Sequence, residues 1–87
     1  MKIKICGLCR EEEIAAVNEV QPDYIGFVFA QGSRRYVDPR QAALLRQGLS
    51  KKIAAAGVFT DAPLEQILQL VYEKVIDIVQ LHGNETL

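Results

Sequence analysis

Several features that mark large classes of proteins are absent from this chain of 87 residues. Its formal net charge is only −1, so it has no basic field that would attract nucleic acid or an anionic membrane. No apolar run approaches the roughly 18 residues that a membrane helix needs. The chain contains neither a G-x-G-x-x-G stretch nor a Walker motif for phosphate. We therefore expect no nucleic-acid partner and no membrane partner.

Cysteine and histidine are also scarce, with two cysteines and one histidine. Cys6 and Cys9 have C-x-x-C spacing, which supplies two metal ligands, and His82 would add only a third. We therefore expect neither a metal nor a cofactor. Met1 is followed by lysines that alternate with isoleucines, and not by the apolar region of a secretory signal. We expect a cytoplasmic protein whose cysteines are thiols.

Alternating segments predict an α/β fold with a parallel sheet. Strand patterns cover residues 2–6, 24–30, 52–60 and 76–82, and helix patterns cover residues 11–20, 38–49 and 61–75. The segment "YIGFVFA" is apolar at both odd and even positions, which is typical of a strand covered on both faces. The order β-α-β-α-β-α-β indicates consecutive parallel βαβ units.

The helix patterns have local signals of their own. Asp38 and Pro39 suit the N-cap and the first position of a helix. Four apolar side chains of the last helix fall at i, i+3, i+4 and i+7, namely Leu64, Ile67, Leu68 and Val71. Asn84 and Glu85 would begin a further helix. Because four strands and three helices do not complete a natural α/β domain, we expect residues 1–87 to be the N-terminal part of one longer domain.

Cys6 is the first candidate for chemistry, since it ends a strand at the edge where parallel α/β folds build their sites. Alternation places Lys4 and Cys6 on one face and Ile3 and Ile5 on the other, under the helices. Cys6 could instead be a small buried hydrophobic residue. A redox pair with Cys9 near a helix N-terminus is a further alternative.

Polar side chains at two other strand ends would face the same region. Gln80 and His82 share one face of the last strand, although a single histidine is more often structural. Arg34 and Arg35 lie in the loop after the second strand. Arginine binds carboxylates through two hydrogen bonds, so one of them could hold an anionic substrate. The alternative is a pair of solvated loop residues.

Five stretches, in order and near family spacing, resemble phosphoribosylanthranilate isomerase, an enzyme family of tryptophan biosynthesis. They are "KICGL" (4–8), "DYIGFVF" (23–29), "SRRYV" (33–37), "GVF" (57–59) and "VQLHG" (79–83). The resemblance implies a (β/α)8 TIM barrel, of which this chain would supply about the first three and a half βα units. It also implies an Amadori rearrangement of N-(5-phosphoribosyl)anthranilate to 1-(2-carboxyphenylamino)-1-deoxyribulose 5-phosphate.

The resemblance also assigns roles to four residues. Cys6 corresponds to the general base that removes the proton from the sugar C2 atom. Arg35 corresponds to the arginine that contacts the anthranilate carboxylate, and Gln80 and His82 line the site. The thiolate is a competent base near neutral pH where a cation favours it, and we expect Lys4 to be that cation. The alternative is that Lys4 pairs with a carboxylate from the rest of the barrel.

The chain departs from the family at Cys9, where the family usually has threonine, so the C-x-x-C spacing is incidental on this interpretation. The family's general acid, an aspartate on a later strand, and its phosphate site are not among these residues. We therefore expect the 87-residue chain alone to be inactive. Two alternatives to an enzyme remain: a fragment that associates with itself or with the complementary half, and a C-x-x-C redox module.

Overall fold

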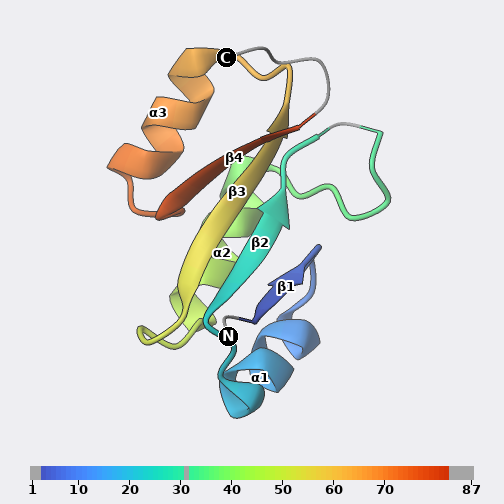
Figure 1. Ribbon diagram of the computed structural model, residues 1–87, viewed down its shortest axis with the longest axis vertical. Coiled ribbons are helices and arrows are strands. Elements are labelled where there is room, and N and C mark those ends of the chain that lie inside the picture. The colour runs from blue at the N-terminus through green and yellow to red at the C-terminus, as the bar shows by residue number, and fades with distance from the viewer. Residues whose placement is uncertain (1–2, 31, 83–87) are drawn as a thin grey trace.

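The computed structural model describes residues 3–30 and 32–82, which build one parallel sheet. Its strands are β1 (Lys4–Cys6), β2 (Tyr24–Val28), β3 (Ala54–Thr60) and β4 (Ile78–His82). Strands that neighbour each other along the chain also pair in the sheet, in the order β1-β2-β3-β4 (Figure 1). The α/β fold with parallel strands is therefore confirmed.

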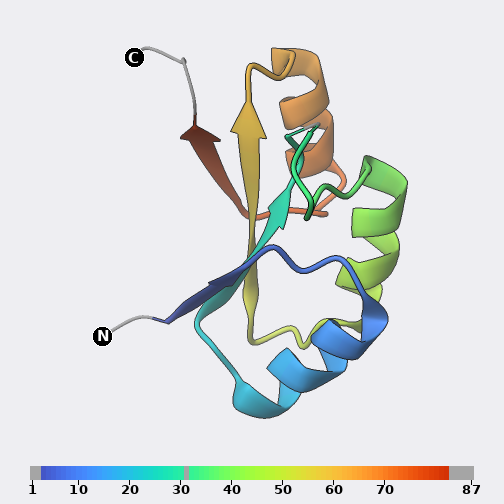
Figure 2. The same cartoon turned by 90° about the vertical axis from the view of Figure 1, so that its right-hand side faces the viewer.

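The three helices are α1 (Glu11–Val20), α2 (Pro39–Gly48) and α3 (Leu64–Tyr72). All three cover the same face of the sheet and leave the opposite face open (Figure 2). Successive crossovers of one hand between parallel strands place every helix on one side in this way. Among the described residues, no helix is both long enough and apolar enough to span a membrane.

Local signals explain where the helices begin. The Asp38 carboxylate accepts a hydrogen bond of 2.7 Å from the Gln41 N–H, and Pro39 is the first residue of α2, both as predicted. The predicted helix 61–75 is shorter, because Pro63 is extended and Lys74 has a left-handed φ of 62°. Asn84 and Glu85, predicted to begin another helix, lie outside the described residues.

The core lies between the sheet and the helices. Ile25 and Phe27 of β2 and Phe59 of β3 are fully buried there. The rings of Phe29 and Phe59 stack with their centroids 5.1 Å apart, which adds to the stabilisation from area burial. Ile5 packs against this core as predicted, whereas Ile3, which was also expected under the helices, is 54% exposed.

Helix α3 buries a narrower face than its pattern suggests. Ile67 and Leu70 are buried, but Leu64, Leu68 and Val71 are 67%, 55% and 39% exposed. Leu64, Leu68 and Val71 thus lie on a second apolar face of α3, which the described residues leave exposed. Val79 and Leu81 of β4 are each 43% exposed as well. Both α3 and β4 therefore carry exposed apolar side chains.

Candidate functional site

The open face of the sheet carries a cleft of about 350 Å³ near the carboxyl ends of the strands. Its lining residues come from all four strands and from the loop after β2: Lys4, Cys6, Val28, Ala30, Ser33, Val58, Thr60 and Gln80. The cleft therefore brings together Cys6 and Gln80, two of the residues that the sequence predicted as site residues. Its position at the strand ends is the usual place for sites in parallel α/β folds.

Cys6 is the last residue of β1, and its exposed thiol lines the cleft. The chain turns immediately after it, at Gly7, whose φ of 81° favours glycine. The N–H groups of Gly7 and Leu8 both donate to the Gly26 carbonyl of β2, at 3.0 and 3.3 Å. These two hydrogen bonds fix the backbone immediately after Cys6 to β2.

Cys9 has different surroundings. It is half-buried and packs against the core, and it borders a hollow between α1 and α2 instead of the cleft. Its carbonyl accepts a hydrogen bond of 2.8 Å from the Gln41 side chain. The two cysteines of the C-x-x-C spacing therefore lie in different environments, one in the cleft and one against the helices.

Lys4 shares the open face with Cys6, as alternation predicts. Its ammonium donates a hydrogen bond to the side-chain oxygen of Gln80 and lies 5.8 Å from the centre of the Tyr24 ring. These contacts place the positive charge of Lys4 inside the cleft. They also connect β1 to β4 across the whole width of the sheet.

Arg35 packs over the turn that follows Cys6. Its Nη1 group donates to the Gly7 carbonyl and to a Glu13 carboxylate oxygen, at 3.2 Å each. A Cβ atom on Gly7 would lie 3.1 Å from the Arg35 Cγ, so the small Gly7 allows this close packing. The geometry therefore brings a guanidinium next to the residue that follows the thiol. Arg34 is exposed in the same loop.

Glu13 links the arginine to the start of α1, a role that the sequence reasoning missed. Its second carboxylate oxygen accepts hydrogen bonds from the N–H groups of Cys9 and Arg10, at 2.9 and 3.1 Å. The bond from Cys9 is the main cause that lowers the pKa of Glu13 below its ordinary value; burial opposes it, and the Arg10 bond and the Arg35 charge add to it. A glutamate three positions after the N-cap could have predicted the bond from the Arg10 N–H, although not the pairing with Arg35.

His82 ends β4 directly beside Thr60 of β3. Its backbone thus reaches the carboxyl end of the sheet, where the cleft opens. Its side chain lies outside the described residues, so its predicted place in the site stays a prediction.

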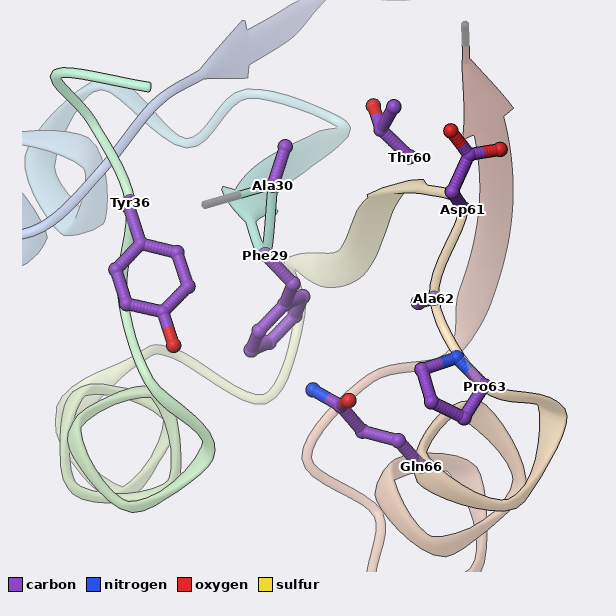
Figure 3. Close-up of a pocket in the computed structure, with 8 residues that line it drawn as sticks. All are labelled: Phe29, Ala30, Tyr36, Thr60, Asp61, Ala62, Pro63 and Gln66. Carbon is purple, nitrogen blue, oxygen red and sulfur yellow. The ribbon is translucent and has the colours of Figure 1, made fainter. Parts of the chain in front are cut away.

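A larger hollow of about 600 Å³ lies beside the cleft, on the helix side of the strand ends. Tyr36 and Gln66 lie on opposite sides of Phe29 there, and Asp61 comes from the loop after β3 (Figure 3). Ala30 and Thr60 line both hollows and so form a shared rim. Cys6, Lys4 and Gln80 line only the smaller cleft, so we assign the reactive site to it, and Arg35 lines neither hollow.

The cleft offers a thiol, an ammonium group and an amide, which are groups that can serve acid–base chemistry. Arg35 does not line the cleft; its guanidinium is held by the Gly7 carbonyl and by Glu13. No carboxylate lines the cleft among the described residues. Of those residues, no three histidine, cysteine or acidic side chains gather where they could hold a metal ion.

Comparison with known proteins identifies one matching family. The family model of N-(5'phosphoribosyl)anthranilate (PRA) isomerase matches residues 3–87. The N-(5'-phosphoribosyl)anthranilate isomerase of Thermoanaerobacter sp. (strain X514) is 45% identical over 86 residues, which cover 99% of this chain and 42% of the relative. The chain thus spans about two fifths of the length of the curated relatives it matches.

Solved structures give the same result. The phosphoribosyl anthranilate isomerase of Thermus thermophilus superposes with a TM-score of 0.88 at 37% identity, over 99% of this chain and 43% of that one. A second isomerase structure, in complex with reduced 1-(o-carboxyphenylamino)-1-deoxyribulose 5-phosphate, has a TM-score of 0.85 at 34% identity, over 99% and 44%. Sequence and fold agree, and the chain belongs to the phosphoribosylanthranilate isomerase family.

Proposed function

We propose that this chain supplies the base-bearing part of a phosphoribosylanthranilate isomerase, which converts N-(5-phosphoribosyl)anthranilate into 1-(2-carboxyphenylamino)-1-deoxyribulose 5-phosphate. The observation that carries the proposal is the exposed Cys6 thiol in a cleft at the strand ends, with Arg35 packed on the next residue. Membership of the family supports the choice of reaction and substrate.

Each group has a role in the rearrangement. Cys6 removes the proton from the sugar C2 atom after the ribose ring has opened. The Lys4 ammonium lies in the same cleft, where it donates a hydrogen bond to Gln80. Arg35 holds the anthranilate carboxylate through guanidinium hydrogen bonds, and Gln80 and His82 line the site.

We propose that the chain acts as part of a complete (β/α)8 barrel. Its partner is the remainder of the barrel, with the general acid and the phosphate site. The exposed apolar side chains of α3 and β4 (Leu64, Leu68, Val71, Val79 and Leu81) support this, because burial against a partner would remove them from water. The share of the relatives that the chain spans, 42%, leaves room for such a partner. Self-association of two copies is the alternative occupant.

A complementation experiment tests the proposal. The chain is assayed alone and after mixing with the remainder of the Thermoanaerobacter barrel, and turnover is followed through the fluorescence of the anthranilate group. We expect activity only in the mixture, since a missing general acid alone costs about 10²- to 10⁴-fold. Size-exclusion chromatography of the chain alone distinguishes a monomer from a self-associated dimer.

Two variants complete the test. Cys6→Ser should abolish the activity of the mixture, whereas Cys9→Ser should leave it unchanged, because Cys9 lies outside the cleft. Full activity of Cys6→Ser would refute the assignment of the base. Loss of activity in Cys9→Ser alone would favour the redox interpretation of the pair.

The proposed compartment is the cytoplasm. The biosynthetic family supports the same location.

A further inference from the structure

Gly26 stands in the middle of β2, where glycine is a poor choice. A glycine inside a strand destabilises it relative to alanine, because it gains no packing and loses more conformational entropy. Its φ is not in the left-handed region, so backbone conformation does not require glycine here. The reason must therefore be the space that a side chain would occupy.

The Cys6 thiol fills that space. The pairing of β1 with β2 sets Gly26 directly beside Cys6, on the same face of the sheet. A Cβ atom on Gly26 would lie 2.9 Å from the Cys6 Sγ and 3.5 Å from the Lys4 Cε. The thiol therefore occupies the volume that any other residue at position 26 would fill.

The backbone of β1 cannot easily move away to make room. The Gly26 carbonyl accepts the hydrogen bonds from Gly7 and Leu8, which anchor the segment immediately after Cys6. A methyl group on Gly26 would therefore displace the thiol itself, or break these two bonds.

The next strand continues the row of small side chains. Gly26 pairs with Ala56 of β3, and Lys4 crosses both strands to reach Gln80 on β4. A larger side chain at either small residue would stand in the way of this crossing. The small size of Gly26 and Ala56 thus leaves room above these two strands for the polar side chains of the cleft.

We propose that Gly26 is a positioning residue, whose missing side chain sets the place of the Cys6 thiol in the cleft. The inference rests on the proposed function only in naming that thiol the catalytic base. The position of the thiol can be measured without any turnover, so the two proposals can fail separately.

A double-mutant cycle tests whether the thiol is what Gly26 accommodates. Gly26→Ala should lower the urea midpoint of unfolding, and Cys6→Ala should restore most of this loss because it removes the Sγ atom. If Gly26→Ala fails to fold, the double variant should still fold. An equal loss with and without the Cys6 sulfur would overturn the inference.

Gly57→Ala is the matched control. Gly57 is also a buried strand glycine, but its Cβ atom would meet Ile76 at 2.8 Å and Phe59 at 2.9 Å, on the helix side of the sheet. Its cost should therefore be the same whether or not Cys6 is present. Restoration of Gly57→Ala by Cys6→Ala would show that the cycle reports general relaxation, and would overturn the inference.

The reactivity of the thiol is the second measurement. In a Cys9→Ser background, iodoacetamide alkylates Cys6 alone. A displaced or off-rotamer thiol should change the rate constant by about 2- to 10-fold in Gly26→Ala. The rate should stay unchanged in Gly57→Ala, and an unchanged rate in Gly26→Ala would contradict the proposal.

Discussion

Glu13 carries three hydrogen bonds from groups that surround the start of α1, and its removal should therefore cost more than the loss of a surface acid. Two of the donors are the backbone N–H groups of Cys9 and Arg10, and the third is the Arg35 guanidinium. Loss of a helix-capping acceptor costs about 1 kcal/mol. The ion pair with Arg35 adds only about 0–1 kcal/mol, because that side chain is 58% exposed and water screens it.

Glu13→Ala should therefore lower the free energy of unfolding by about 1–2 kcal/mol at pH 7. For a domain of this size the melting temperature should fall by about 4–8 °C for each kcal/mol. Glu13→Gln keeps one carbonyl oxygen for the backbone N–H groups and should cost about half as much. Urea and thermal unfolding, followed by circular dichroism, measure both effects.

The effect should also depend on pH. The pKa of Glu13 is lowered below its ordinary value of 4.5, mainly by the hydrogen bond from Cys9. The ionised form is thus the one that the folded state favours. Its contribution is complete above about pH 4.5 and disappears as the pH falls below that value, through the lowered pKa. The stability difference between wild type and Glu13→Gln should therefore shrink as the pH falls below 4.5.

Glu12→Ala is the control, because Glu12 is exposed in the same first turn and affects α1 only through the helix dipole, by about 0.3–1 kcal/mol. The reasoning is refuted if Glu13→Ala costs no more than Glu12→Ala. It is also refuted if the cost of Glu13→Gln does not fall as the pH is lowered progressively below 4.5. Within the proposed function, Glu13→Gln should raise KM for the substrate more than it lowers kcat, since a loosened Arg35 weakens binding.

Three further predictions concern stability and use the same unfolding assay. Asp38→Ala removes the N-cap of α2 and should cost about 0.5–2 kcal/mol. Ile67→Ala should cost about 2–5 kcal/mol, while the exposed Leu68→Ala should cost under about 1 kcal/mol in the chain alone; similar costs would contradict the orientation of α3. Asp77→Asn should destabilise the fold by about 1 kcal/mol at pH 7 and by less below pH 3.8. Although partial burial alone would raise the Asp77 pKa, hydrogen bonds from Arg46 and from a backbone N–H lower it, and an unchanged cost at low pH would refute this.

The local signals in the sequence predicted the elements and their order well. The acids of "EEEIAAV" and the Asp38–Pro39 pair mark helix starts that the structure confirms at Glu11 and Pro39. Such signals act over three or four residues through hydrogen bonds to nearby N–H groups, so they can be seen in one short stretch. Alternation likewise placed Lys4 and Cys6 on one face, and parallel strand order brought Gln80 to the same cleft.

Other features depend on residues that are distant in sequence. Helical periodicity shows that α3 has apolar faces, but only the packing of the sheet decides that Ile67 is buried and Leu68 is exposed. Glu13 and Arg35 are 22 residues apart, and no local pattern predicts that they pair.

The division between sequence and tertiary structure is clearest at the cysteines. The sequence alone shows that Cys6 ends a strand and that Cys9 precedes a helix, because both facts follow from backbone hydrogen bonding along short segments. Only the pairing of β1 with β2 decides that the Cys6 thiol lies over Gly26, because strand register joins residues 20 positions apart. Contacts made through register and crossover geometry depend on the whole chain at once, and the thiol's place in the cleft is such a contact.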